Sequence, residues 1–135
     1  MKRREMIQQF VPASPLVQLL GMQLVAIEDG RAELALPYRP ELATMQDMVH
    51  GGAIASLIDT AGMAATWSDD TEPESLAGAT VTLNVNYVAA ARGQDLTAVA
   101  TVSKRGRSIV FSDVRVTEPG GRLVATGSVV QRFSL

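Results

Sequence analysis

The sequence predicts an α+β fold in which an antiparallel sheet of about six strands wraps around one long central helix. Three observations support this prediction. Residues 51 to about 67 have apolar side chains at helical spacing, most other apolar segments alternate as strands do, and the links between those segments are short. The chain has 135 residues, so we expect a single domain, residues 1–135, with one hydrophobic core.

Before the long helix, the sequence predicts a short helix, a β-hairpin and a loop. The expected boundaries are 2–10 for the short helix, 16–20 for a following turn, 22–27 and 31–38 for the two strands, and 39–49 for the loop. Pro12 and Pro15 should end the short helix, because proline lacks the N–H that a helix interior needs. Residues 28–30, Glu-Asp-Gly, are a strong signal for the hairpin turn.

After the long helix, four strands are expected, and short links predict that each pairs with the next as a hairpin. Their expected boundaries are 79–88, 95–104, 108–117 and 122–133. The first strand has the clearest alternation, with apolar Val81, Leu83, Val85 and Tyr87 on one face and polar Thr80, Thr82, Asn84 and Asn86 on the other. One helix covers only one face of such a sheet, so the other face must contact a partner or water.

The composition excludes several classes of function. The formal net charge is −2, so no basic surface is expected for nucleic acids or anionic membranes. The chain has no cysteine and one histidine, which excludes thiolate chemistry and paired-histidine zinc motifs, and we expect no cofactor and no metal. The basic N-terminus lacks a following apolar signal-peptide core, and no segment has the length of a membrane span. We therefore expect a cytoplasmic protein without membrane contact.

The start of the long helix contains the most informative motif, His50-Gly51-Gly52. The first turn of a helix has backbone N–H groups without partners, and none of residues 49–52 is a good capping residue. Uncapped N–H groups on glycines can approach a substrate oxygen closely, and the helix dipole adds partial positive charge there. The motif therefore predicts a site that polarises a carbonyl or stabilises an oxyanion. A plain glycine turn into the helix is the alternative interpretation.

Asp59 lies in the middle of the predicted helix, where a carboxylate is unusual. Its neighbours at helical spacing are mostly small, including Ala55, Ser56 and Gly62, which leaves room beside the carboxylate. We interpret Asp59 as a general base or a nucleophile. The alternative is an acid that faces solvent or forms a structural pair.

The spacing of Gly51 and Asp59 indicates that the two residues can act on the same substrate molecule only if they belong to different subunits. Asp59 follows Gly51 by eight residues, which is about 12 Å along a helix. A single carbonyl group cannot contact both from one chain. Two antiparallel copies of the helix would bring Gly51 of one subunit to Asp59 of the other, and a two-fold dimer would contain two such sites.

These residues resemble the hotdog-fold acyl-CoA thioesterases of the phenylacetate-degradation and 4-hydroxybenzoyl-CoA types. The resemblance extends over nearly the whole chain, and its most specific part is His50-Gly51-Gly52 with an acid nine residues after the histidine. Supporting matches are the segments 15–22, 80–87, 106–107 and 121–127. The resemblance implies hydrolysis of an acyl- or aryl-CoA thioester to a free acid and CoA. It also implies homodimers whose sheets join edge to edge, typically paired into homotetramers.

The resemblance assigns roles to individual residues. It implies that Gly51 polarises the carbonyl through its N–H, that Asp59 attacks the carbonyl or activates water, and that Thr80 helps to place this water. His50 matches the family histidine that shapes the site, and a core or turn histidine is the competing account. The residues expected to contact the substrate are Gly52, Met63, Asn84 and Arg107.

The chain departs from the family pattern in two places. An amide is common six residues before the histidine and a glycine three before it, whereas this chain has Thr44 and Asp47 there. Gln46 is the candidate that takes over the amide role. The family's basic-proline pair after the Asn-x-Tyr segment is replaced by Ala89-Ala90-Ala91, so the family pattern does not define the contacts to CoA.

Two other functions are compatible with the same motif. One is a non-catalytic hotdog protein that binds acyl-CoA, which the departures at Thr44 and Asp47 allow. The other is a hydratase of enoyl thioesters, which needs a histidine and an acid that act as a pair on one substrate. The position of His50 before the helix fits a thioesterase better.

Overall fold

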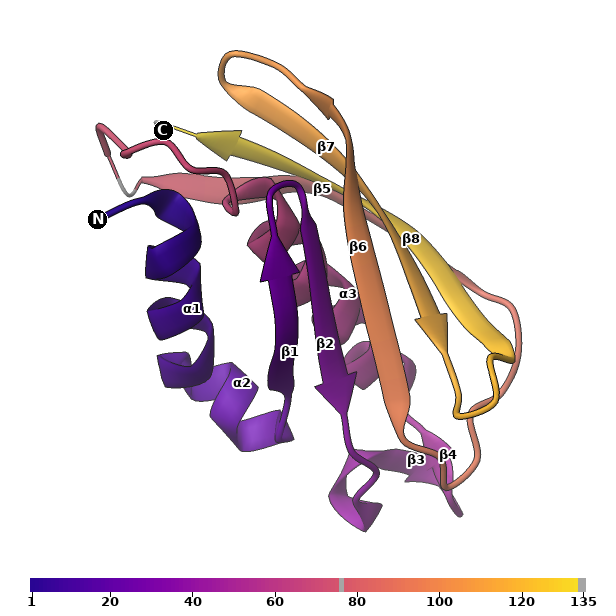
Figure 1. Cartoon of the computed structure of the whole chain (residues 1–135). Helices are drawn as coiled ribbons and strands as arrows, with labels where there is room; N and C mark the ends of the chain where they lie inside the picture. Colours follow the sequence, from indigo (N-terminus) through magenta and orange to yellow (C-terminus); the bar gives the residue numbers. More distant parts are fainter. Residues whose placement is uncertain (76, 134–135) are drawn as a thin grey trace.

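The computed structural model describes residues 1–75 and 77–133, in which a curved antiparallel sheet of six strands packs around the long helix α3 (Gly51–Thr66) (Figure 1). The strands in sheet order are β1 (Gln23–Glu28), β2 (Arg31–Leu36), β6 (Leu96–Arg105), β7 (Ile109–Thr117), β8 (Leu123–Phe133) and β5 (Gly78–Tyr87). The predicted fold is confirmed, as is the first hairpin, in which Glu28 lies opposite Arg31.

Helix α3 packs one face against the concave side of the sheet. Its buried residues include Leu57, Ile58, Ala61 and Ala65, and the helix contacts β2, β6, β7 and β8. Gly62 permits a close approach to β8, because a Cβ atom at this position would lie 2.5 Å from the Cβ of Val129. The opposite face, which we call the open face of α3, is half-buried or exposed and consists of Gly52, Ala55, Ser56, Asp59, Thr60 and Met63.

We expect Gly62→Ala to lower the free energy of unfolding, although alanine normally stabilises a helix relative to glycine by about 1 kcal/mol. The added methyl group would overlap Val129, and overpacking of a core costs about 1–3 kcal/mol. Urea unfolding at constant protein concentration measures the change. Thr60→Ala, on the open face of the same helix, is the control and should have a much smaller effect. A more stable Gly62→Ala protein would contradict this packing.

The N-terminal segment differs from the prediction in two respects. Helix α1 (Arg3–Ala13) continues through Pro12, and the following residues form a second helix, α2 (Pro15–Leu20), rather than a turn. Pro12 is tolerated because it lies in the last turn of α1, and Pro15 occupies a first helical position, where an N–H has no helical partner. Helix α1 packs on β1 through buried residues. In the part of the chain described, no helix combines the length and apolar character needed to cross a membrane.

The segment predicted as a loop, residues 39–49, contains short regular elements. A 3₁₀ helix, η1, spans Pro40–Leu42, and strands β3 (Ala43–Met45) and β4 (Met48–Val49) form a small separate hairpin. Gln46, in the turn of this hairpin, has a left-handed backbone with a φ of 53°. Strands this short have too few residues for a clear alternation, so the sequence pattern does not reveal them.

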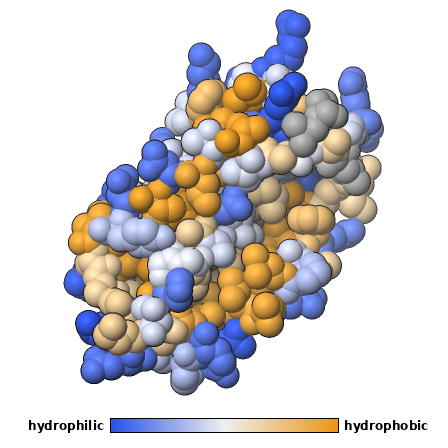
Figure 2. Space-filling model, turned by 180° about the vertical axis from the view of Figure 1, so that it is seen from behind, coloured by the Kyte–Doolittle hydropathy of each residue, from blue (hydrophilic) through white to orange (hydrophobic). Residues whose placement is uncertain are grey.

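Strand pairing differs from the prediction at β5. Strands β6, β7 and β8 are successive hairpins, as expected, but β5 pairs with β8, and β6 pairs with β2. The link of residues 88–95 is long enough to cross between these positions, and β5 becomes an edge strand. Its apolar residues Val81, Leu83 and Tyr87 are therefore 51%, 40% and 53% exposed. Figure 2, which views the molecule from behind, shows several separate apolar patches on that face.

Candidate active site

Asp59 is held in position by two consecutive hydrogen bonds that begin at Gln131. The Gln131 side-chain amide donates to the Thr80 hydroxyl, and this hydroxyl donates to Asp59 Oδ1 at 2.7 Å. The three residues belong to β8, β5 and α3, and Gln131 is only 2% exposed. A hydroxyl group has one proton. Because Gln131 occupies an acceptor position of Thr80, this proton is directed at Asp59.

A β-bulge in β5 turns Thr80 toward the helix. Thr80 lies opposite Gln131 and Thr82 opposite Val130, so Val81 is an extra residue in β5. With strict alternation, Thr80 would share the face that Thr82 occupies, which points away from α3. The bulge therefore makes the contact between Thr80 and Asp59 possible.

The second carboxylate oxygen of Asp59 is available for chemistry. Within residues 1–75 and 77–133, Oδ2 has no hydrogen-bond partner, whereas Oδ1 accepts from Thr80. Asp59 is partly exposed, because it lies on the open face of α3. A carboxylate with one oxygen fixed and the other free can attack a carbonyl carbon or accept a proton from water.

His50 caps helix α3, so the expectation of an uncapped helix start is wrong. Its Nδ1 accepts the N–H of Gly52 at 2.8 Å, which places the proton of the neutral imidazole on Nε2. Sequence reasoning missed this cap because histidine is not among the preferred N-cap residues. The cap occupies the N–H of Gly52 and makes that group unavailable to a substrate.

The amide of Gly51 is the donor that remains at the start of α3. Its N–H has no partner among the residues that the structure describes. The Gly51 carbonyl accepts a hydrogen bond from the Tyr87 hydroxyl at 2.7 Å, which holds this part of the chain in place. A Cβ atom at Gly51 would lie 3.3 Å from the Tyr87 ring, so glycine fits best here. A free donor at the positive end of a helix is suited to bind a carbonyl oxygen or an oxyanion.

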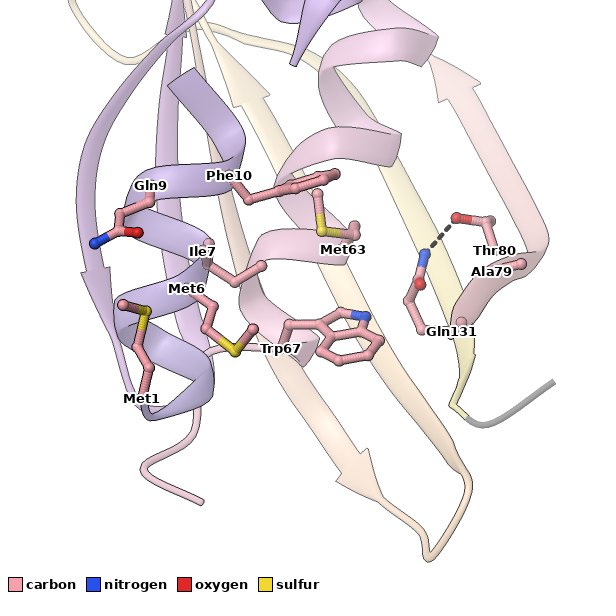
Figure 3. A pocket seen from close by; sticks show the side chains of 11 residues that line it. Met1, Met6, Ile7, Gln9, Phe10, Met63, Trp67, Ala79, Thr80 and Gln131 are labelled. Carbon is pink, nitrogen blue, oxygen red and sulfur yellow. Dashed lines mark hydrogen bonds between the residues drawn. The ribbon is translucent and has the colours of Figure 1, made fainter. Parts of the chain in front are cut away.

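Two separate cavities adjoin these groups. The first cavity, of about 440 Å³, lies between α1, the C-terminal half of α3 and the start of β5, and Thr80 and Gln131 form part of its wall (Figure 3). The second cavity, of about 370 Å³, has Gly51 and Tyr87 in its wall. Thr80, the hydrogen-bond partner of Asp59, and Gly51 thus line different cavities. No described contact brings the two groups together in one chain.

Two further predicted residues lie beside this candidate site. Gly52 and Met63 are both on the open face of α3, and Met63 also lines the first cavity together with Trp67. In the described part of the chain, no three histidine, aspartate or glutamate side chains are placed to hold a metal ion.

Three predicted residues lie apart from the hydrogen bonds around Asp59. Gln46 is exposed in the turn between β3 and β4, and Arg107 is exposed in the turn between β6 and β7. Asn84 lies opposite Ser128, on the face of β5 that points away from α3. Any role of these residues at the site depends on a second subunit or on the bound substrate.

Sequence reasoning missed Gln131, Tyr87 and helix α1 as contributors to the site. A signal for Gln131 was present, because it alternates with Val129 and Phe133 and is therefore a polar residue on the buried face of a strand. Tyr87 is part of the apolar alternation of β5, so the sequence pattern does not indicate its hydrogen bond to the Gly51 carbonyl. Helix α1 is remote in sequence from Asp59, so no local pattern connects the two.

The chain is similar to known proteins in sequence and in fold. A sequence model described as the thioesterase superfamily matches residues 46–125. A protein from Halobacterium salinarum is 37% identical over 117 residues, covering 84% of this chain and 77% of that protein. The medium/long-chain acyl-CoA thioesterase YigI of Escherichia coli is 29% identical over 122 residues, with coverage of 81% and 79%. The solved structure of a thioesterase family protein from Silicibacter pomeroyi has a TM-score of 0.87 at 25% identity and covers 96% of both chains.

Proposed function

The chain belongs to the thioesterase superfamily and is a thioester hydrolase with the hotdog fold, and we propose that it cleaves acyl-CoA thioesters at sites shared by two subunits. A relative named as an acyl-CoA thioesterase supports acyl-CoA as the substrate class. The observation that carries the proposal is the Asp59 carboxylate, which Thr80 holds through one oxygen beside a largely apolar cavity.

Asp59 supplies the reacting group in this proposal. Its Oδ2 attacks the carbonyl carbon of the thioester, or it takes a proton from the water molecule that attacks. The C–S bond then breaks, and the CoA thiolate leaves and takes up a proton. In the first route, water afterwards opens the anhydride between the acyl group and Asp59. Both routes consume one water molecule and release a free acid.

Gly51 supplies the electrophilic assistance. Negative charge develops on the carbonyl oxygen as the carbon is attacked, and a fixed N–H donor stabilises this charge. The N–H of Gly51, which no described residue engages, lies at the positive end of α3 and suits this role. His50 contributes indirectly, because its cap at Gly52 fixes the first turn of the helix.

A second subunit completes the site. Gly51 and Asp59 are eight residues apart on α3, about 12 Å along the helix axis, so one carbonyl cannot contact both in the same chain. The open face of α3 consists mainly of small residues. Strand β5 has exposed apolar side chains and one edge that pairs with no other described strand. Both features favour a second copy that adds β5 to β5 and places the two α3 helices antiparallel and side by side.

The direct test is the release of free CoA thiol from a panel of acyl-CoA substrates by the purified protein. We expect thiol release that is saturable in substrate. Binding of acyl-CoA without thiol release would reject hydrolysis and favour an acyl-CoA-binding protein. Addition of water to crotonyl-CoA without thiol release would favour a hydratase.

We further infer that Gln131 positions Asp59 through Thr80. Thr80→Val should lower kcat about tenfold or more, because a hydrogen bond to a charged group contributes about 1.5–3 kcal/mol. Gln131→Met keeps the length of the side chain but cannot donate to Thr80, so it should also lower kcat, by a smaller factor, with KM nearly unchanged. Gln23→Met, an exposed change on β1, is the control.

The double variant tests whether Gln131 acts through Thr80. In the Thr80→Val protein, Gln131→Met should cause little further loss of kcat, because the hydroxyl that it positions is already absent. Equal losses from Gln131→Met in the wild-type and Thr80→Val backgrounds would show that the two residues act independently.

A further inference from the structure

The first cavity has the chemistry of a binding site for an apolar chain. Its wall includes Met6, Phe10, Met63 and Trp67, and among the described residues that form it no side chain carries a charge. Methionine side chains are flexible and fill irregular spaces, so they adapt to chains of different length and path. An uncharged aliphatic group suits this lining better than a charged or strongly polar one.

Two polar side chains of the cavity wall, Thr80 and Gln131, lie on the side next to Asp59, and another, Gln9, lies on α1. Thr80, which donates to Asp59 Oδ1, lines the cavity together with Gln131. Figure 3 shows these two residues on one side and the α1 side chains Met6 and Phe10 on the other. Met63 lies one helical turn after Asp59 and borders the same space. A thioester whose carbonyl carbon is near Asp59 can therefore extend its acyl chain past Met63 toward α1.

Helix α1, which forms the far wall of the cavity, is bonded to the segment that follows α3. The N–H groups of Arg3 and Arg4 donate to the carbonyls of Thr71 and Asp69 at 2.9 and 3.0 Å. The Arg3 guanidinium also pairs with the Asp69 carboxylate at 3.3 Å and stacks on the Trp67 ring at 5.2 Å. These contacts hold α1 at a defined distance from Thr80, so the cavity has a defined depth.

We propose that the first cavity binds the acyl group of the substrate as an unbranched aliphatic chain, and that Met6 and Phe10 limit the length of this chain. The inference rests on the proposed thioester hydrolysis at Asp59. The volume favours a chain over a single aromatic ring, since an apolar cavity of about 150 Å³ is sufficient for benzene, and this cavity has about 440 Å³. Phe10 is 58% exposed, and a bound chain would cover part of its ring.

Trp67 provides a direct readout of binding, because it is the only tryptophan in the chain and lines the cavity. The Asp59→Asn protein is used so that the thioester remains intact during the measurement. We expect decanoyl-CoA to change the tryptophan emission in a saturable manner, and acetyl-CoA and free CoA to cause little change. No response to decanoyl-CoA, or an equal response to all three ligands, would overturn the proposal.

Variants of α1 test the limit on chain length. Phe10→Ala should raise the ratio of kcat/KM for palmitoyl-CoA to that for decanoyl-CoA by about tenfold, an effect typical of small changes in an apolar pocket. Met6→Trp should lower the same ratio, because the larger ring shortens the cavity. Gln8→Ala is the control, since Gln8 is exposed on α1 and is not part of the wall.

Two outcomes of these assays would overturn the proposal. One is an equal change of kcat/KM for all chain lengths in Phe10→Ala, and the other is a preference of the wild type for benzoyl-CoA over every aliphatic substrate. The proposed function would fail in a different way. A protein that releases no thiol from any substrate would contradict hydrolysis, but its Trp67 emission could still respond to decanoyl-CoA and not to acetyl-CoA.

Discussion

Replacing Asp59 with asparagine should lower kcat by about 10²–10⁴-fold, with KM and the oligomeric state nearly unchanged. Asparagine has the same size, and its carbonyl oxygen can still accept the hydrogen bond from Thr80. Its amide group cannot attack a thioester carbon or take a proton from water, so only the chemical step is lost. The measurement is free-thiol release from a medium-chain acyl-CoA under saturating and limiting substrate.

Asp113→Asn is the matched control for this experiment. Asp113 is exposed on β7, on the side of the sheet away from α3, and its replacement causes the same change in net charge. It should leave kcat close to the wild-type value. Full turnover by the Asp59→Asn protein would remove Asp59 from the mechanism.

A mixture of two inactive variants should recover activity, because each site takes its two groups from different subunits. Asp59→Asn removes the carboxylate, and Gly51→Pro removes the N–H at the first helical position, where proline is tolerated. A hybrid dimer has one site with the intact Gly51 of the first variant and the intact Asp59 of the second. In random mixing half of the dimers are hybrids with one of two sites intact, so activity should reach about a quarter of the wild-type value.

The controls separate loss of the N–H from changes in packing. Gly51→Ala retains the N–H but also places a Cβ atom near the Tyr87 ring, so it reports the steric effect alone. His50 already has the extended backbone that a residue before proline adopts, with φ of −60° and ψ of 134°. Hybrids isolated through two affinity tags that remain inactive would contradict a shared site, as would an active monomer.

The sequence predicted most of the fold because periodicity is a local property. Apolar spacing placed the long helix at 51–67 against Gly51–Thr66 in the structure, and the last four strands within one residue of their observed ends. The pairing of β5 with β8 was not predictable in this way. Short links suggested successive hairpins, whereas pairing depends on which strands cover α3 after the chain has folded.

The candidate site likewise contains residues that local sequence patterns predicted and contacts that they did not predict. Asp59 and Gly51 stood out because a mid-helix acid and a glycine-rich helix start are unusual in any sequence. The contact of Asp59 with Thr80 needs the bulge at Val81, which reverses the face that simple alternation assigns to Thr80. The cap by His50 likewise depends on a backbone and side-chain geometry that residue preferences do not encode.

Local patterns along the chain were thus sufficient to predict the type and order of the main elements. They also singled out Asp59 on the helix and gave its distance from the Gly51 amide. Folding was required to join Gln131 to Thr80, to direct Thr80 at Asp59, and to form a cavity wall from α1. The physical reason is that side-chain period and helical rise are properties of neighbouring residues. Hydrogen bonds between strands and the walls of cavities arise between residues that are distant in sequence, and packing alone selects them.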